Sequence, residues 1–175
     1  MRIYVLSLLL LLHGALLQAA EPISLQAGPL TMIFEPDNAF LRYVNLGPHE
    51  VLRGINAPIR DQFWGTVQPA VTNVTLNKQD DQFELEFDAA CQEQDVNFFW
   101  HGTIRGSAAG RLELVFDGVA RSTFLRNRIG FCVLHGPSAA GAAWVAHDPQ
   151  GERSAGAFPT FISPHQPAKD LRTFA

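Results

Sequence analysis

The chain has few cysteines, few lysines and none of the short motifs that mark metal or nucleotide sites. Its 175 residues include two cysteines, Cys91 and Cys132, and two lysines. No His-x-His, His-Glu-x-x-His or paired-cysteine motif occurs, so the sequence predicts no metal site. A Gly-x-Ser-x-Gly elbow and a glycine-rich phosphate loop are also missing, and we predict no cofactor.

The two cysteines permit at most one intramolecular bridge. Export from the cytoplasm would make a disulfide between Cys91 and Cys132 chemically possible. Cys132, however, lies in an apolar run that we expect to form a strand, where a buried free thiol is common. The sequence leaves both states open.

Long apolar runs are missing after residue 20. Before it, Arg2 precedes the apolar stretch Val5–Leu12, and Leu17–Ala20 supplies small residues. This order is typical of a cleaved signal peptide, with an uncleaved anchor as the alternative. We therefore predict a signal peptide over residues 1–20, one mature domain over 21–175, a periplasmic or secreted location, and no membrane span after cleavage.

Positive charge is also scarce. Removal of Arg2 with the leader leaves 12 lysines and arginines against 17 acidic residues, a formal charge of −5. A negative mature chain argues against nucleic acid or an anionic membrane surface as a general partner.

What the sequence does contain is one strand-like segment after another, separated by turn residues. In the run 83–88, Phe83, Leu85 and Phe87 alternate with acidic residues, as in a half-buried antiparallel strand. Similar segments recur about every ten residues. We predict an all-β, antiparallel β-sandwich, and we leave open that it is incomplete at the C-terminus, where Pro164 and Pro167 interrupt a strand-like start.

The segment 122–135 carries two arginines in a strand-like run. Strict alternation would place Arg126 and Arg128 on one face, with Gly130 beyond them. The other face would be apolar core, formed by Leu125, Ile129, Phe131 and Val133. Guanidinium groups bind carboxylates in a bidentate way, so we interpret this face as a site for an acidic or hydroxylated small molecule. The alternative is a structural ion-pair network with Asp61, Glu84 and Asp88.

Two further residues are weaker candidates for substrate binding. Trp64, next to Gly65, could provide a stacking surface for a sugar ring, although a single tryptophan more often belongs to the core. His165 lies between Pro164 and Pro167, and such a rigid segment could position an acid, a base or a hydrogen-bond donor. The alternative for His165 is a loop histidine that caps a backbone carbonyl.

The chain resembles the D-apionate lactonase family over nearly all of the mature sequence. The resemblance rests on Leu41–Tyr43, Glu50–Arg53, Arg60–Asp61, Trp64–Val67, Ser122–His135, Ile162–Pro167 and Lys169–Asp170. It implies an enzyme of bacterial sugar-acid catabolism that hydrolyses D-apionolactone to D-apionate. It also implies that the matched part is an N-terminal β-sandwich domain, followed in the family by a (β/α) barrel-like domain and a further C-terminal domain.

The predicted function follows from that resemblance. We expect a β-sandwich domain that supports or binds a sugar acid or lactone in a sugar-degradation pathway. If the chain is a fragment, its expected partner is a following catalytic barrel domain. None of the family's catalytic residues can be placed on this chain, so its catalytic residues are unknown and whether it is itself an enzyme stays open. The alternatives are a stand-alone carbohydrate-binding module or an inactive fragment of a longer exported glycoside or lactone hydrolase.

Overall fold

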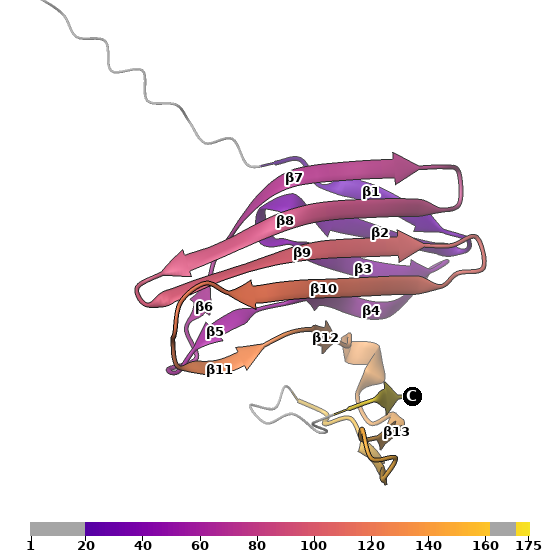
Figure 1. The fold of residues 1–175 in the computed structure, drawn as a ribbon. Coiled ribbons are helices and arrows are strands. Elements are labelled where there is room, and N and C mark those ends of the chain that lie inside the picture. The colour runs from indigo at the N-terminus through magenta and orange to yellow at the C-terminus, as the bar shows by residue number, and fades with distance from the viewer. Residues whose placement is uncertain (1–19, 162–170) are drawn as a thin grey trace, which may run out of the picture.

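The computed structural model describes residues 20–161 and 171–175, and their regular structure consists almost entirely of antiparallel strands (Figure 1). A five-stranded sheet has the order β1-β2-β3-β4-β12, formed by Ile23–Ala27, Leu30–Glu35, Phe40–Leu46, His49–Asn56 and Cys132–Leu134. A four-stranded sheet has the order β10-β9-β8-β7, formed by Leu112–Ala120, Val96–Gly106, Phe83–Glu93 and Pro69–Lys78.

These two sheets pack face to face and bury the main core between them. In β8, Phe83, Leu85 and Phe87 are buried, whereas the intervening acidic residues are partly exposed, which confirms the predicted alternation. The Phe87 ring joins the layers, because its centroid lies 5.1 Å from that of Phe34 on β2 and 5.0 Å from that of Trp100 on β9. The prediction of an all-β, antiparallel fold is therefore confirmed.

A third, smaller sheet lies beside the sandwich. It has the order β11-β5-β6 and comprises Arg126–Ile129, Ile59–Asp61 and Thr66–Val67. The chain leaves this sheet after β11 and immediately pairs with β4 as β12, the edge strand of the five-stranded sheet. Gly130 lies at the change of partner with a φ of +126°, a left-handed backbone conformation that favours glycine. The run 124–135, expected to form one strand, is thus two short strands in different sheets.

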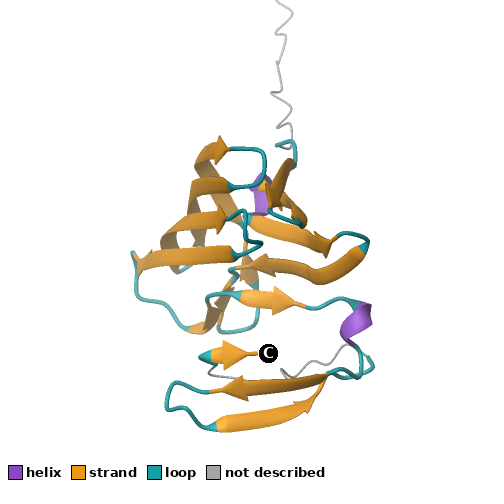
Figure 2. Ribbon diagram, turned by 90° about the vertical axis from the view of Figure 1, so that its right-hand side faces the viewer, coloured by secondary structure: helices purple, strands orange, loops and turns teal. Residues whose placement is uncertain are grey.

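The C-terminal part forms a separate three-stranded sheet with the order β14-β13-β15, formed by Arg153–Ala157, Ala143–His147 and Thr173–Phe174. Among the described residues there are also two short 3₁₀ helices, η1 (Pro36–Asn38) and η2 (Pro137–Ala139), and η2 connects β12 to this sheet. Figure 2 shows the sheet set apart from the sandwich. It has its own aromatic cluster, in which the His135 ring centroid lies 4.6 Å from that of Phe158 and 5.8 Å from that of Phe174.

Two sequence predictions concern segments outside the described residues. The predicted signal peptide spans residues 1–20, of which only Ala20 is described, and His165 lies within the segment 162–170. Across the described ranges, no helix has the length and apolar character needed to span a bilayer. Both cysteines are free thiols, with Cys91 buried and Cys132 half-buried.

Candidate functional site

The loop between β5 and β6 presents Trp64 at the surface. The Asp61 carboxylate holds this loop, because its Oδ1 atom accepts hydrogen bonds from the backbone N–H groups of Phe63 and Gly65, both at 2.8 Å. Gly65 is required by this geometry, since a Cβ there would lie 2.6 Å from Asp61 Oδ2. Trp64 adopts a φ of +73° and is 51% exposed. A tight, carboxylate-centred turn thus displays an indole ring.

Two arginines converge on that ring. Arg60 on β5 and Arg128 on β11 are cross-strand partners, and their Cζ atoms lie 5.8 Å and 5.4 Å from the Trp64 ring centroid. Both distances are within the range of cation–π attraction. Arg60 Nε is buried and has no hydrogen-bond acceptor among residues 20–161 and 171–175. We call Arg60, Trp64 and Arg128 the Arg–Trp cluster.

Arg126 is not part of this cluster, and the prediction that it shares a face with Arg128 is wrong. Arg126 pairs with Asp61, whereas Arg128 pairs with Arg60, so Asn127 is an extra residue that forms a bulge. Consecutive residues of β5 point to opposite faces, and their partners Arg126 and Arg128 therefore do so as well.

The predicted apolar core face of this segment is also wrong in most positions. Leu125, Phe131 and Val133 are 69%, 43% and 48% exposed, whereas Ile129 packs against the core. The prediction assumed an unbroken two-residue alternation along this segment. The bulge at Asn127 and the change of sheets at Gly130 each break that alternation.

The acids considered as partners of the two arginines have other roles. Asp61 accepts backbone hydrogen bonds, and Glu84 pairs with Arg105. Asp88 lies 2.9 Å from His101 Nδ1 and accepts a 2.8 Å hydrogen bond from Asn73 Nδ2. These hydrogen bonds, first that from Asn73 and then that from His101, hold the pKa of Asp88 below its usual value.

Sequence reasoning named Trp64 and Arg128 but did not name Arg60 as a site residue. The sequence did contain a signal for Arg60. It lies in a short strand directly before Asp61, Trp64 and Gly65, and this composition is typical of turns in which an aspartate side chain accepts backbone hydrogen bonds. The other sequence-predicted candidate, His165, is outside the described residues. In the described parts of the chain, no three metal-ligating side chains gather at one place.

The fold is that of an antiparallel β-sandwich domain that carries a cluster of two guanidiniums and an indole. A family model described as the N-terminal domain of D-apionate lactonase matches residues 10–175, and this chain belongs to that family. It is 32% identical to the D-apionate lactonase of Brucella anthropi over 166 residues, which are 93% of this chain. The chain spans only 27% of that relative's length. No solved structure matches it significantly.

Proposed function

We propose that this N-terminal domain of a D-apionate lactonase-like protein binds a sugar acid or its lactone at the Arg–Trp cluster. The observation that supports this proposal is the convergence of two guanidiniums on one half-exposed indole, with the buried Arg60 Nε lacking an acceptor within the described residues. The other N–H groups of the Arg60 guanidinium can donate hydrogen bonds to a bound anion.

The chemistry of the Brucella relative's named substrate suits this cluster. Hydrolysis of a sugar lactone yields a hydroxy acid, whose carboxylate can accept charge-assisted hydrogen bonds from Arg60 or Arg128. The indole of Trp64 offers an apolar surface for the carbon skeleton. The Asp61-centred turn fixes that surface before a ligand arrives, which lowers the entropic cost of binding.

We assign binding, and no catalytic step, to these residues. Lactone hydrolysis needs a base that activates water and donors that stabilise the developing oxyanion. The guanidiniums can serve as donors, but the nearby Asp61 carboxylate is committed to two backbone N–H groups. The catalytic step therefore belongs, in this proposal, to the part of the longer relative that this chain does not span.

Calorimetry with sodium D-apionate tests the proposal. Arg128→Ala and Trp64→Ala should each weaken binding about tenfold, equivalent to about 1.4 kcal/mol. Arg153→Ala removes an exposed arginine from the separate β14 strand and should leave affinity unchanged. Equal affinity of wild type and Arg128→Ala would remove Arg128 from the site, and no heat with any variant would refute sugar-acid binding.

A second candidate function, packing against the rest of a longer protein, is favoured by exposed apolar residues beside the cluster. Phe63 and Leu125 are 81% and 69% exposed, and in the chain they lie close to Asp61 and Arg126, which are cross-strand partners on β5 and β11. Isolated apolar side chains are common on surfaces, but grouped ones mark interfaces. We propose that this apolar tip contacts the region that follows the N-terminal domain in the longer relative.

Binding in trans tests the packing role. The remainder of the Brucella anthropi relative, produced without its N-terminal domain, should co-elute with this chain in size-exclusion chromatography. Phe63→Ser combined with Leu125→Ser should abolish co-elution while leaving the melting temperature of this chain nearly unchanged, because both side chains are exposed. Co-elution that survives the double substitution would place the interface elsewhere.

A further inference from the structure

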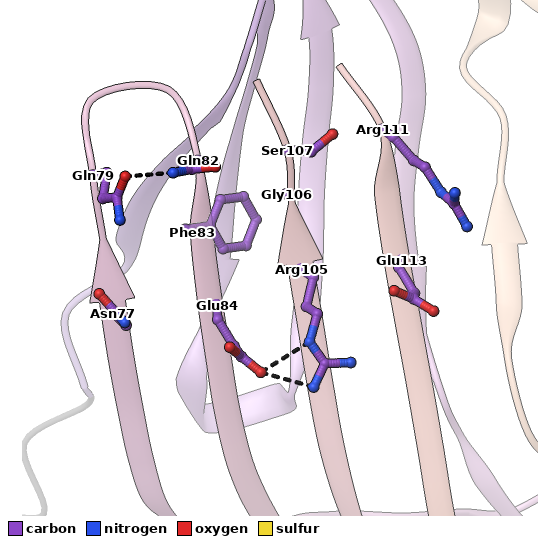
Figure 3. A pocket seen from close by; sticks show the side chains of 10 residues that line it. All are labelled: Asn77, Gln79, Gln82, Phe83, Glu84, Arg105, Gly106, Ser107, Arg111 and Glu113. Carbon is purple, nitrogen blue, oxygen red and sulfur yellow. Dashed lines mark hydrogen bonds and ion pairs between the residues drawn. The ribbon is translucent and has the colours of Figure 1, made fainter. Parts of the chain in front are cut away.

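A polar hollow of about 500 Å³ lies on the outer face of the four-stranded sheet (Figure 3). It is bounded by the β7–β8 turn, which contributes Gln79 and Gln82, and by the β9–β10 turn, which contributes Ser107 and Arg111. Its volume is within the range of small-molecule sites. The hollow belongs to a different sheet from the Arg–Trp cluster and is independent of the function proposed above.

The residues on the floor of this hollow are brought together by the register of four neighbouring strands. Asn77 pairs with Glu84, Glu84 with Arg105, and Arg105 with Glu113, so these four residues form one row across β7, β8, β9 and β10. Adjacent strands in a sheet are about 4.8 Å apart. The row therefore alternates an amide, a carboxylate, a guanidinium and a second carboxylate at regular spacing, and Figure 3 shows these side chains along neighbouring strands.

The charges in the row are only partly paired. Glu84 Oε1 accepts a hydrogen bond from Arg105 Nε at 2.8 Å and forms an ion pair with Arg105 Nη2 at 2.7 Å. This contact, followed by the field of Glu113 and Glu86, raises the pKa of Arg105 above its usual value. Within the described chain, the side chains of Arg111 and Glu113 line the same hollow without a hydrogen bond to another residue. One donor group and one acceptor group thus remain available beside a fixed ion pair.

The equal number of positive and negative side chains in the hollow indicates which class of ligand it can bind. Two guanidiniums and two carboxylates line the hollow, so neither an anion nor a cation gains a net attraction. A hydroxyl both donates and accepts hydrogen bonds, and neighbouring hydroxyls can therefore bridge Glu113 to Arg105 or Arg111. We propose that this hollow is a binding site for a neutral saccharide, distinct from the sugar-acid site in both place and charge preference.

Saturation-transfer NMR with three neutral disaccharides, xylobiose, cellobiose and maltose, tests this site. At least one should receive magnetisation from the protein and give a dissociation constant by titration. Glu113→Ala and Arg111→Ala should each weaken that binding at least fivefold. Asp117→Ala is the matched control, because Asp117 is an exposed acid on the same strand and face but outside the hollow.

The outcomes separate the two sites. Arg128→Ala should leave disaccharide binding unchanged, and Glu113→Ala should leave D-apionate binding unchanged, so that either proposal can fail alone. All substituted positions in the hollow and its control are exposed, and unchanged melting temperatures would show that folding is intact. The proposal is overturned if none of the disaccharides receives saturation, or if Glu113→Ala and Arg111→Ala both bind as wild type does.

Discussion

Asp61 controls the shape of the β5–β6 turn through hydrogen bonds to backbone N–H groups. Its Oδ1 atom binds the N–H groups on both sides of Trp64, at Phe63 and Gly65, and its carboxylate occupies the space that a side chain at position 65 would need. Positive φ is costly for an aromatic residue, so Trp64 keeps its orientation only while the turn is held. Asp61 is therefore a positioning residue for the Arg–Trp cluster.

Asp61→Ala should loosen the turn and lower stability by about 1 kcal/mol through the lost hydrogen bonds. Trp100 and Trp144 are buried, so acrylamide quenching of tryptophan fluorescence reports mainly on Trp64. Quenching should increase in Asp61→Ala, and D-apionate affinity should fall. Asp61→Asn keeps an acceptor oxygen and serves as the control. Identical quenching in Asp61→Ala and wild type would show that the turn holds its shape without the carboxylate.

At the scale of elements, the facing strands of the sandwich carry the core through their aromatic side chains. Phe87 is 2% exposed, and its contacts reach both layers. Gly102 on β9 makes room for it, since a Cβ at that position would lie 2.3 Å from the Phe87 ring. Phe87 on β8 and Gly102 on β9 are cross-strand partners, and the Phe87 ring fills the space that a side chain at position 102 would need.

Phe87→Ala should lower the free energy of unfolding by about 3–5 kcal/mol, because it leaves a cavity between the sheets. Gly102→Ala should cost about 1–3 kcal/mol by overpacking against the same ring. Val119→Ala, at a position 53% exposed, should change stability by less than about 0.5 kcal/mol. Urea unfolding monitored by circular dichroism measures all three. A Phe87→Ala protein as stable as Val119→Ala would contradict this account of the core.

The sequence was a good guide to the long strands and a poor one to β11. Alternation identified β8 correctly because most of its residues have partners on both sides and one face is buried from Phe83 to Cys91. The bulge at Asn127 depends on pairing with the distant strand β5, and no local pattern reveals an extra residue. Sequence reasoning therefore recognised the segment as strand-like, but it expected one strand where there are two and placed Arg126 on the same face as Arg128.

The candidate site shows the same limit. Trp64 and Arg128 were recognised separately, from composition and from charge within a strand. Their contact is a tertiary one, created when β11 pairs with β5 and brings Arg128 next to Arg60. The register of this pair could not be derived from the sequence because both strands are only three or four residues long. The hollow in Figure 3 also depends on register, across four strands.

At the scale of the whole molecule, the described chain has two hydrophobic centres, the sandwich core and the aromatic cluster of the C-terminal sheet. The second centre includes His135, and burial lowers the pKa of its imidazole. A lowered pKa means that the folded state binds fewer protons than the unfolded state. The stabilising contribution is present above pH 6.5 and is lost as the pH falls through the folded-state pKa.

Acidification from pH 7.5 to pH 5.5 should therefore weaken the C-terminal sheet before it affects the sandwich. Asp88 does not contribute in this window, because its lowered pKa confines its titration to more acidic solutions. His135→Leu removes the titrating group, and its melting temperature should fall less over this interval than that of wild type. Differential scanning calorimetry measures the difference. Parallel pH profiles for the two proteins would assign the acid sensitivity to other groups.

The two free thiols differ in a way that makes the molecule easy to tag. Burial raises the pKa of Cys91 to about 11, so only about one molecule in ten thousand carries that thiolate at pH 7, whereas Cys132 is half-buried on the edge strand β12. A maleimide dye should attach at Cys132 alone, which peptide mass spectrometry can verify; a dye found on Cys91 would contradict this. Because β12 follows β11 directly, wild-type protein already contains a single fluorescent reporter position next to the strand that carries Arg128.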